Sequence, residues 1–129
     1  MITPILNFLI YFLSAITCSL IFIVIYDWVT PYHEVQLIRK GNLSAVISLG
    51  GALIGFILPL ASVIRSSIDL LDLTLWALVA LLVQISMHLL IRVFIPDLKK
   101  FIDQDIPAPA LWHSFCAISI GLINAACMS

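Results

Sequence analysis

Charged side chains are scarce in this chain. Only 10% of its 129 residues are Asp, Glu, Lys or Arg, whereas 63% are hydrophobic, and the formal net charge is −1. A soluble domain needs about 25% charged residues to cover its surface, so these proportions exclude a soluble fold. The small net charge also excludes the basic surface by which proteins bind nucleic acid. We therefore expect the chain to lie in a lipid bilayer, with no nucleic-acid partner.

Residues that commonly carry chemistry are also few. The three cysteines, Cys18, Cys116 and Cys127, fall in hydrophobic segments without C-x-x-C spacing, which indicates packing rather than metal or redox work. His33 and Glu34 are adjacent, which is not a metal-ligand spacing. The zinc-protease, nucleophile-elbow and phosphate-loop motifs are missing from the sequence. We expect no enzymatic activity, no metal and no cofactor.

Four hydrophobic windows are long enough to cross a membrane, at residues 5–26, 43–64, 73–95 and 110–128. A helix needs about 20 apolar residues to span the hydrocarbon core, and only helices satisfy their own backbone hydrogen bonds there. The sequence thus predicts one all-α, four-span membrane domain over residues 1–129. The first window has no preceding Lys or Arg and no cleavage site after it, so we expect a retained span rather than a signal peptide.

Basic residues are distributed unequally between the two sides of this arrangement. The first and third connections share one side with five Lys or Arg residues, whereas the other side has Arg65 alone. The positive-inside rule predicts that connections one and three are cytoplasmic and that both termini are periplasmic. The five residues are Arg39, Lys40, Arg92, Lys99 and Lys100.

The first connection, TPYHEVQLIRKGN at residues 30–42, has the signals of a short helix. Thr30 is a candidate N-cap before Pro31 at the first helical position, and Gly41 is a helix stop before Asn42, which can cap the next helix. Apolar and charged positions alternate at helical spacing, which predicts an amphipathic helix in the membrane interface. The apolar positions are Tyr32, Val35 and Ile38, opposite Glu34 and Lys40.

The second half of the chain weakly repeats the first. Pro96 follows the third window as Pro31 follows the first, 65 positions earlier, and Phe101-Ile102 correspond to Leu37-Ile38. Either these matches arose by chance or the chain contains two duplicated helical hairpins, each with a short interfacial helix in its connection. Duplication would relate the halves by a pseudo-twofold axis along the membrane normal.

Small and polar residues follow helical stripes within the windows. Helices associate in lipid through close backbone approach and hydrogen bonds rather than through apolar burial. We therefore expect a set of helix-packing positions, which includes a G-x-x-x-G step and a helix-kinking proline. The set is Gly51, Gly55, Pro59 and Gly121.

Gln84, His88 and Arg92 lie four residues apart in the third window. Ionisable residues within spans usually face the bundle interior or a water-filled cavity, so these residues predict a polar seam, which His113 and Asn124 could share. Two alternatives remain for Arg92: it extends to the cytoplasmic headgroups, or it pairs with Glu34. No window contains Asp or Glu, which counts against a carboxylate-based relay.

TPYHEVQLIRKGN, GGALIGFILPL, the Trp and Gln of the third window and GLINAACM resemble the YjfL-like family of small bacterial inner-membrane proteins, domain of unknown function 350. The resemblance covers residues 26–128 and implies four spans in a bacterial inner membrane. It also implies that the gene lies near genes for membrane-stress proteins that resemble phage-shock factors, and near genes for ATP-grasp ligases. The recurrent family positions correspond to Thr30, Pro31, Glu34, Leu37, Ile38, Asn42, Gly51, Gly55, Pro59, Trp76, Gln84, Arg92, Gly121, Asn124, Ala125 and Ala126.

Two functional hypotheses follow. The first is a non-enzymatic, homo-oligomeric membrane module whose cytoplasmic helices recruit a stress-response protein. The second is a small channel or transporter subunit whose path follows the polar seam. The candidate functional positions are Glu34, Asn42, Gln84, His88, Arg92, His113 and Asn124.

Overall fold

The computed structural model describes residues 2–30, 34–66 and 69–128, and all regular structure in those residues is helical. Four helices are long and apolar enough to cross a membrane, and two short helices lie in the first and third connections, which confirms the expected all-α, four-span architecture. The windows match the long helices to within a few residues, although the first helix already begins at Ile2. The long helices are α1 (Ile2–Val29), α3 (Leu43–Ser66), α4 (Leu70–Phe94) and α6 (Pro107–Met128), and the short ones are α2 (Glu34–Arg39) and α5 (Leu98–Asp103).

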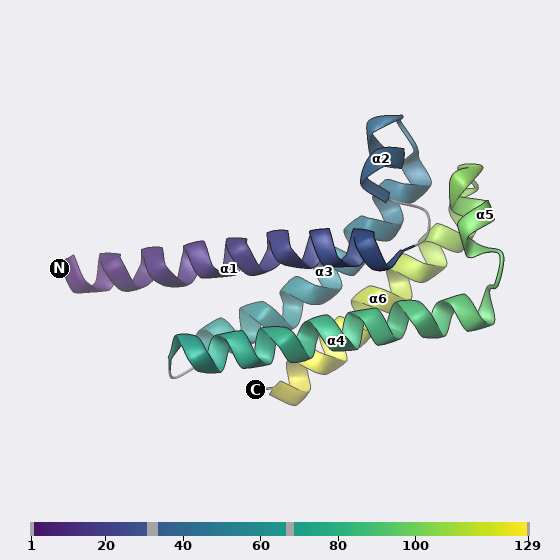
Figure 1. Ribbon diagram of the computed structural model, residues 1–129. Coiled ribbons are helices and arrows are strands. Elements are labelled where there is room, and N and C mark those ends of the chain that lie inside the picture. Colours follow the sequence, from purple (N-terminus) through teal and green to yellow (C-terminus); the bar gives the residue numbers. More distant parts are fainter. Residues whose placement is uncertain (1, 31–33, 67–68, 129) are drawn as a thin grey trace.

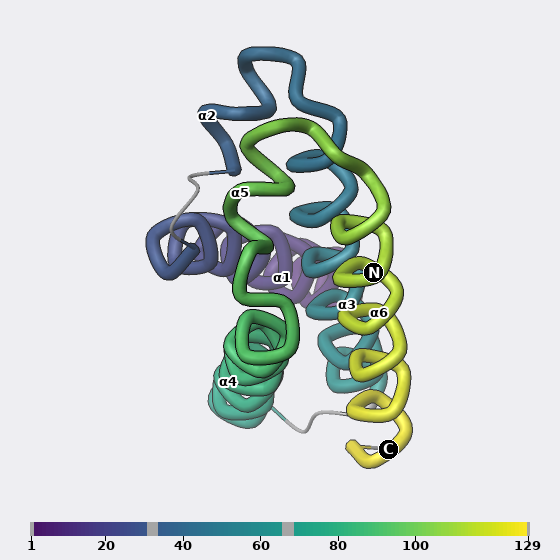
Figure 2. Tube along the Cα trace, turned by 90° about the vertical axis from the view of Figure 1, so that its right-hand side faces the viewer, coloured from purple at the N-terminus to yellow at the C-terminus, as the bar shows by residue number. Residues whose placement is uncertain are grey.

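The long helices form two pairs that cross obliquely. In Figure 2, α1 and α4 run along the line of sight, one above the other, whereas α3 and α6 stand side by side. Figure 1 shows α2 and α5 together at one end of the molecule, with the start of α1 and the ends of α3 and α6 toward the other. We call the end formed by α2, α5 and the starts of α3 and α6 the α2/α5 end.

Helices α3 and α6 pack most closely, because small residues face each other at their crossing. A Cβ atom added at Gly121 would lie 2.6 Å from the Cα of Gly55, and one added at Gly51 would lie 2.6 Å from the Cβ of Ser114. Such distances leave no room for any side chain, so the G-x-x-x-G step of α3 lies against α6. Pro59, in the same helix, is fully buried.

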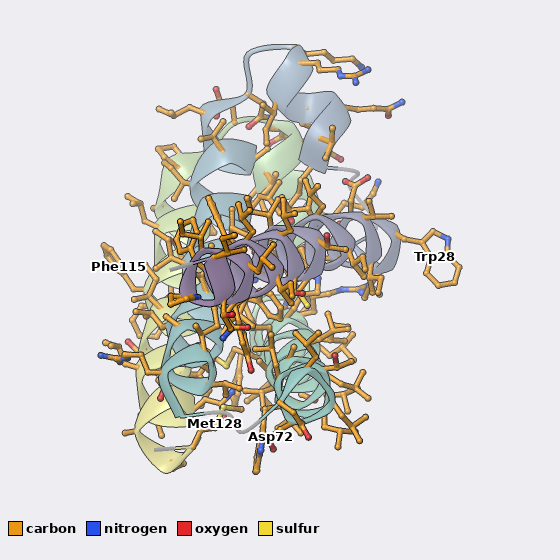
Figure 3. All side chains as sticks on the ribbon, turned by 90° about the vertical axis from the view of Figure 1, so that its left-hand side faces the viewer. Trp28, Asp72, Phe115 and Met128 are labelled. Carbon is orange, nitrogen blue, oxygen red and sulfur yellow. The ribbon has the colours of Figure 1, made fainter. Side chains whose placement is uncertain are left out.

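Helix α1 packs differently, since its buried residues lie in its C-terminal half. Phe22 and Tyr26 are its buried residues among those described, and Phe22 stacks on Phe56 of α3 with ring centroids 4.4 Å apart. The N-terminal half extends beyond the other helices (Figure 1). Large side chains face outward elsewhere as well: Trp28 and Phe115 point away from the bundle on opposite sides (Figure 3).

The two short helices end in the same way, which favours duplication over chance as the origin of the sequence matches. Gly41 and Asp105, which are 64 positions apart, both have positive φ angles, +87° and 56°. The N–H of each donates to a carbonyl three residues earlier, Ile38 and Ile102, at 3.0 Å in both cases. The next N–H donates in both helices to the carbonyl five residues earlier at 2.9 Å, which completes a Schellman motif. The stop signal predicted at Gly41 is therefore confirmed.

The expected cap at the start of α2 is wrong. The Thr30 hydroxyl donates to the Asp27 carbonyl at 3.1 Å, and the Thr30 N–H donates to the Tyr26 carbonyl, so Thr30 ends α1. The Asp27 carboxylate instead accepts the Val35 N–H at 3.1 Å and caps α2. Pro31, to which the prediction assigned the first helical position, and Tyr32 lie outside the described residues.

Candidate functional site: a buried tyrosine–histidine cluster and the α2/α5 end

Three polar side chains from three helices meet inside the bundle. The hydroxyl of Tyr26 (α1) lies 3.2 Å from Nδ1 of His88 (α4) and 3.0 Å from Nε2 of His113 (α6). The two ring nitrogens are themselves 3.1 Å apart. Each of the three residues is only 1% exposed. We call these residues the Tyr–His–His cluster.

Two neighbouring contacts extend the cluster along the helix interfaces. Ser48 of α3 lies with its hydroxyl 3.1 Å from Nδ1 of His113, on the side of the ring away from Tyr26. One turn from His88, Gln84 donates its amide to the Ala117 carbonyl of α6 at 3.1 Å. A Cβ atom on Gly55 would lie 2.6 Å from that amide nitrogen. Glycine at position 55 therefore makes the space in which Gln84 joins α4 to α6.

The polar seam expected along Gln84, His88 and Arg92 continues only as far as His88. Arg92 is exposed, and the buried face of α4 proceeds from His88 to Ile91. A helix has 3.6 residues per turn, so each step of four residues rotates by about 40°, and two steps move Arg92 off the buried face. The ion pair considered for Arg92 and Glu34 is not present among the described residues.

Glu34 also lies on the other side of its helix from the one expected. The amphipathic pattern placed it on the charged, outward face of the first connection, but its side chain is fully buried at the start of α2. Lys40, assigned to the same face, is exposed. A helix of six residues has little more than one turn and a half, and its packing against α3 rather than its charge pattern sets which side chains are covered.

The α2/α5 end is held together by side chains that cross between the two halves of the chain. The Asn42 side chain accepts the Ala45 N–H at 2.9 Å, which confirms it as the α3 cap, and its amide donates to the Ile102 carbonyl of α5 at 2.7 Å. Asp105 accepts both the N–H and the hydroxyl of Ser44 at 2.8 Å. These two hydrogen bonds hold the pKa of the Asp105 carboxyl below its usual range, and the bond from the Ser44 N–H has the larger effect.

Apolar packing beneath these hydrogen bonds fixes the same end. Leu98 and Ile102 of α5 are buried together with Ala45, Ile91 and Ala110. Exposed lysines and arginines lie in the same two connections. They are Arg39, Lys40, Lys99 and Lys100, and Lys99 forms an ion pair with Asp103 at 3.6 Å.

Asn124 lies far along α6 from the cluster, near its C-terminal end. Its side chain is half-buried, and its amide nitrogen has no hydrogen-bond partner among the described residues. The structure therefore groups Gln84, His88 and His113, places Glu34 and Asn42 at the α2/α5 end, and leaves Arg92 and Asn124 apart from both.

Sequence reasoning missed the central residue of the cluster. Tyr26 lies within the first apolar window of the sequence. A tyrosine near the end of a span is usually a headgroup anchor, so its type and position gave no signal of burial. The spacing of His88 and His113 inside separate spans was the available clue, because two buried imidazoles require hydrogen-bond partners.

The comparisons with known proteins agree with this architecture. A family model described as "Domain of Unknown Function (DUF350)" matches residues 1–128, so the match also includes the first span, which precedes the residues 26–128 covered by the resemblance. "UPF0719 inner membrane protein YjfL" of Escherichia coli (strain K12) is 32% identical over 124 residues, 96% of this chain and 94% of the relative. "UPF0719 transmembrane protein YshE" of Bacillus subtilis (strain 168) is 28% identical over 118 residues, 87% and 84% of the two chains. No solved structure matches.

Proposed function

Because the chain belongs to the DUF350 family, we propose that it is a non-enzymatic, oligomeric module of the bacterial inner membrane, linked to envelope stress, whose α2/α5 end recruits a cytoplasmic protein. Its four apolar helices and its inner-membrane relatives fit a multi-pass inner membrane protein. The positive-inside rule places the α2/α5 end in the cytoplasm and both termini in the periplasm.

The observation that carries this proposal is that hydrogen bonds of Asn42 and Asp105 join the two connections. A surface that is already ordered loses little conformational freedom when a partner binds, so more of the contact energy appears as affinity. Two six-residue helices would not be ordered in isolation. Their ordering against α3 and α6 therefore supports a docking role for this end.

Exposed basic side chains give the same end its chemical character. Lys40 and Lys100 are exposed on different connections, and Figure 1 shows those connections beside each other. A partner protein with an acidic surface would be attracted to these lysines. The anionic lipids of the inner leaflet would also attract them and so hold the α2/α5 end at the membrane surface.

The structure gives less support to the channel hypothesis. Gln84 and His88 are each 1% exposed, and Gln84 is hydrogen-bonded across a close helix crossing. A path for ions along these residues requires water that this packing leaves no room for. Such a path would have to lie between copies of the protein.

The largely exposed N-terminal half of α1 supports the oligomeric part of the proposal. Asn7 is exposed there, and it lines an open apolar groove of about 540 Å³ between α1 and Ile64 of α3. An amide in or near hydrocarbon gains a hydrogen bond when a neighbouring helix supplies a partner. A second copy of the chain meets that need.

Charge reversal tests the recruitment. We expect Lys40→Glu combined with Lys100→Glu to reduce capture of a cytoplasmic partner about tenfold or more, or ~1.4 kcal/mol. Capture is measured by in-cell cross-linking and copurification from native membranes, with subunit counting on the same sample. Arg65→Glu, an exposed basic residue near the other end of α3, is the matched control.

Equal capture by the wild type and the double variant would contradict the recruitment. A C-terminal reporter that is active only in the cytoplasm should remain silent, and a bright signal would reverse the proposed orientation. Glu34 is unsuitable for this test, because a change at a fully buried residue would also perturb folding.

A further inference from the structure

The Tyr–His–His cluster brings three donor atoms to one point. Its edges of 3.0, 3.1 and 3.2 Å join atoms from three different helices in the buried interior of the bundle. Helix packing alone does not require such convergence, since each side chain could instead bond to a neighbouring carbonyl, as Gln84 does.

Hydrogen bonds among the three neutral groups cannot fully satisfy this triangle. A neutral ring nitrogen carries either a hydrogen or a lone pair, never both. Each edge needs one of each, so a closed ring of three separate hydrogen bonds is impossible, and one edge must share a hydrogen with another. A single cation between the atoms would interact favourably with all three lone pairs.

We propose that Tyr26, His88 and His113 form a buried binding site for one divalent first-row transition-metal ion, Zn²⁺ or Cu²⁺. Both ions favour imidazole nitrogen. The centre of a triangle with 3.1 Å edges lies roughly 1.8 Å from each corner (3.1/√3), so an ion about 2.0–2.1 Å from each atom would sit about 1 Å out of their plane. The distances between the three atoms are therefore compatible with one ion bound to all of them.

Ser48 supplies the outer contact that such a site needs. A metal-binding histidine usually donates its other ring N–H to a fixed acceptor, which sets the ring's orientation and tautomer. The Ser48 hydroxyl oxygen lies 3.1 Å from Nδ1 of His113 and can accept that hydrogen, which leaves a lone pair on Nε2 for the ion.

The third donor is a phenol, which explains why the sequence did not indicate a metal site. The described residues contain no group of three His, Cys, Asp or Glu side chains that could hold a metal ion. Binding replaces the phenolic hydrogen of Tyr26 with the metal, and that proton leaves to solvent. The phenolate then offsets one of the two positive charges of the ion, which lowers the cost of burying it.

Metal titration of the full-length protein tests the proposal. The protein is purified in detergent without a histidine tag, stripped with a chelator, and titrated separately with Zn²⁺ and with Cu²⁺. We expect one ion per protomer by elemental analysis. Cu²⁺ should also produce a phenolate-to-copper charge-transfer absorption band.

Single variants separate this site from other metal ligands. His88→Gln and His113→Gln should each weaken binding at least tenfold, Tyr26→Phe should abolish the charge-transfer band, and Ser48→Ala should weaken binding roughly 10- to 100-fold. Replacing the three free cysteines, Cys18, Cys116 and Cys127, by alanine is the control and should leave binding unchanged.

Several outcomes would overturn the proposal. Folded wild-type protein that binds neither ion, or binding that persists unchanged in both histidine variants, would show that the cluster is a hydrogen-bonded network only. Loss of binding in the cysteine-free protein would place the ion at the thiols. If the histidine variants do not fold, Tyr26→Phe, which removes one oxygen, decides the question by the presence or absence of the absorption band.

Discussion

The α3–α6 pair and the N-terminal half of α1 differ in how closely they pack against other helices. At the α3–α6 crossing, Gly55 and Gly121 let the two backbones touch. In α1, large aliphatic and aromatic side chains cover the outer surface, and only 6% of its membrane-length window is buried, against 56% for α3. Both segments are strongly apolar, yet only one of them forms the core.

This difference follows from the solvent. Lipid chains are as apolar as leucine, so burying an aliphatic side chain against another helix gains little. Close backbone approach and hydrogen bonds gain more, and both need small or polar residues. Hydrophobicity therefore identifies the spans, whereas the small and polar residues identify which spans pack.

The largest effect expected from this comparison is at Gly55. Gly55→Val would insert side-chain atoms against the Ala117 carbonyl and the Gln84 amide, and we expect it to lower the free energy of unfolding by at least about 3 kcal/mol. Gly50→Val is the matched control, because a Cβ there meets nothing within 4 Å; we expect a change within about 0.5 kcal/mol. Denaturant unfolding in micelles measures both. Equal losses would mean that the crossing is not as close as described.

A smaller effect distinguishes the two halves of α1. Phe22→Ala removes the ring stacked on Phe56, and we expect a loss of about 2–3 kcal/mol in the same assay, because lipid chains can partly fill the space from the open groove at Cys18 and Leu81. Leu13, which is 60% exposed, serves as the control, and Leu13→Ala should have almost no effect on the monomer. A large loss at Leu13 would indicate that a further helix covers this half of α1.

The same comparison explains what the sequence could reveal. Span positions, the Gly41 stop and the Asn42 cap depend on local composition and spacing, and they were predictable. The location of Tyr26 beside His88 and His113 depends on how α1 crosses α4 and α6, which no local pattern encodes. Glu34 was misplaced for the same reason, since contacts with the rest of the bundle outweigh the pattern of a six-residue helix.

Arg92 shows a more specific limit. Counting in steps of four predicted a continuous row, and the rotation that accumulates over two steps took Arg92 out of it. The buried row of α4 instead mixes steps of three and four residues and ends at Ile91 rather than at Arg92; it is Leu73, Ala77, Ala80, Gln84, His88 and Ile91. The helical period is known in advance, but three polar residues are too few to determine which face of the helix is buried.

The smallest predicted effect concerns the two hydrogen bonds between Ser44 and Asp105 at the α2/α5 end. Asp105→Asn keeps a side chain that tolerates positive φ but removes the charge that accepts the Ser44 N–H and hydroxyl, so we expect a modest decrease in Tm at neutral pH. The folded pKa of Asp105 is lowered, so its stabilisation is present above the ordinary carboxyl value of about 4 and is lost as the pH falls through the folded pKa. The Tm difference between wild type and variant should therefore shrink in acid.

Asp97→Asn is the control, because Asp97 lies in the same connection and its side chain makes no capping hydrogen bond. A Tm difference that stays constant in acid would show that Asp105 acts through the shape of the turn rather than through its charge.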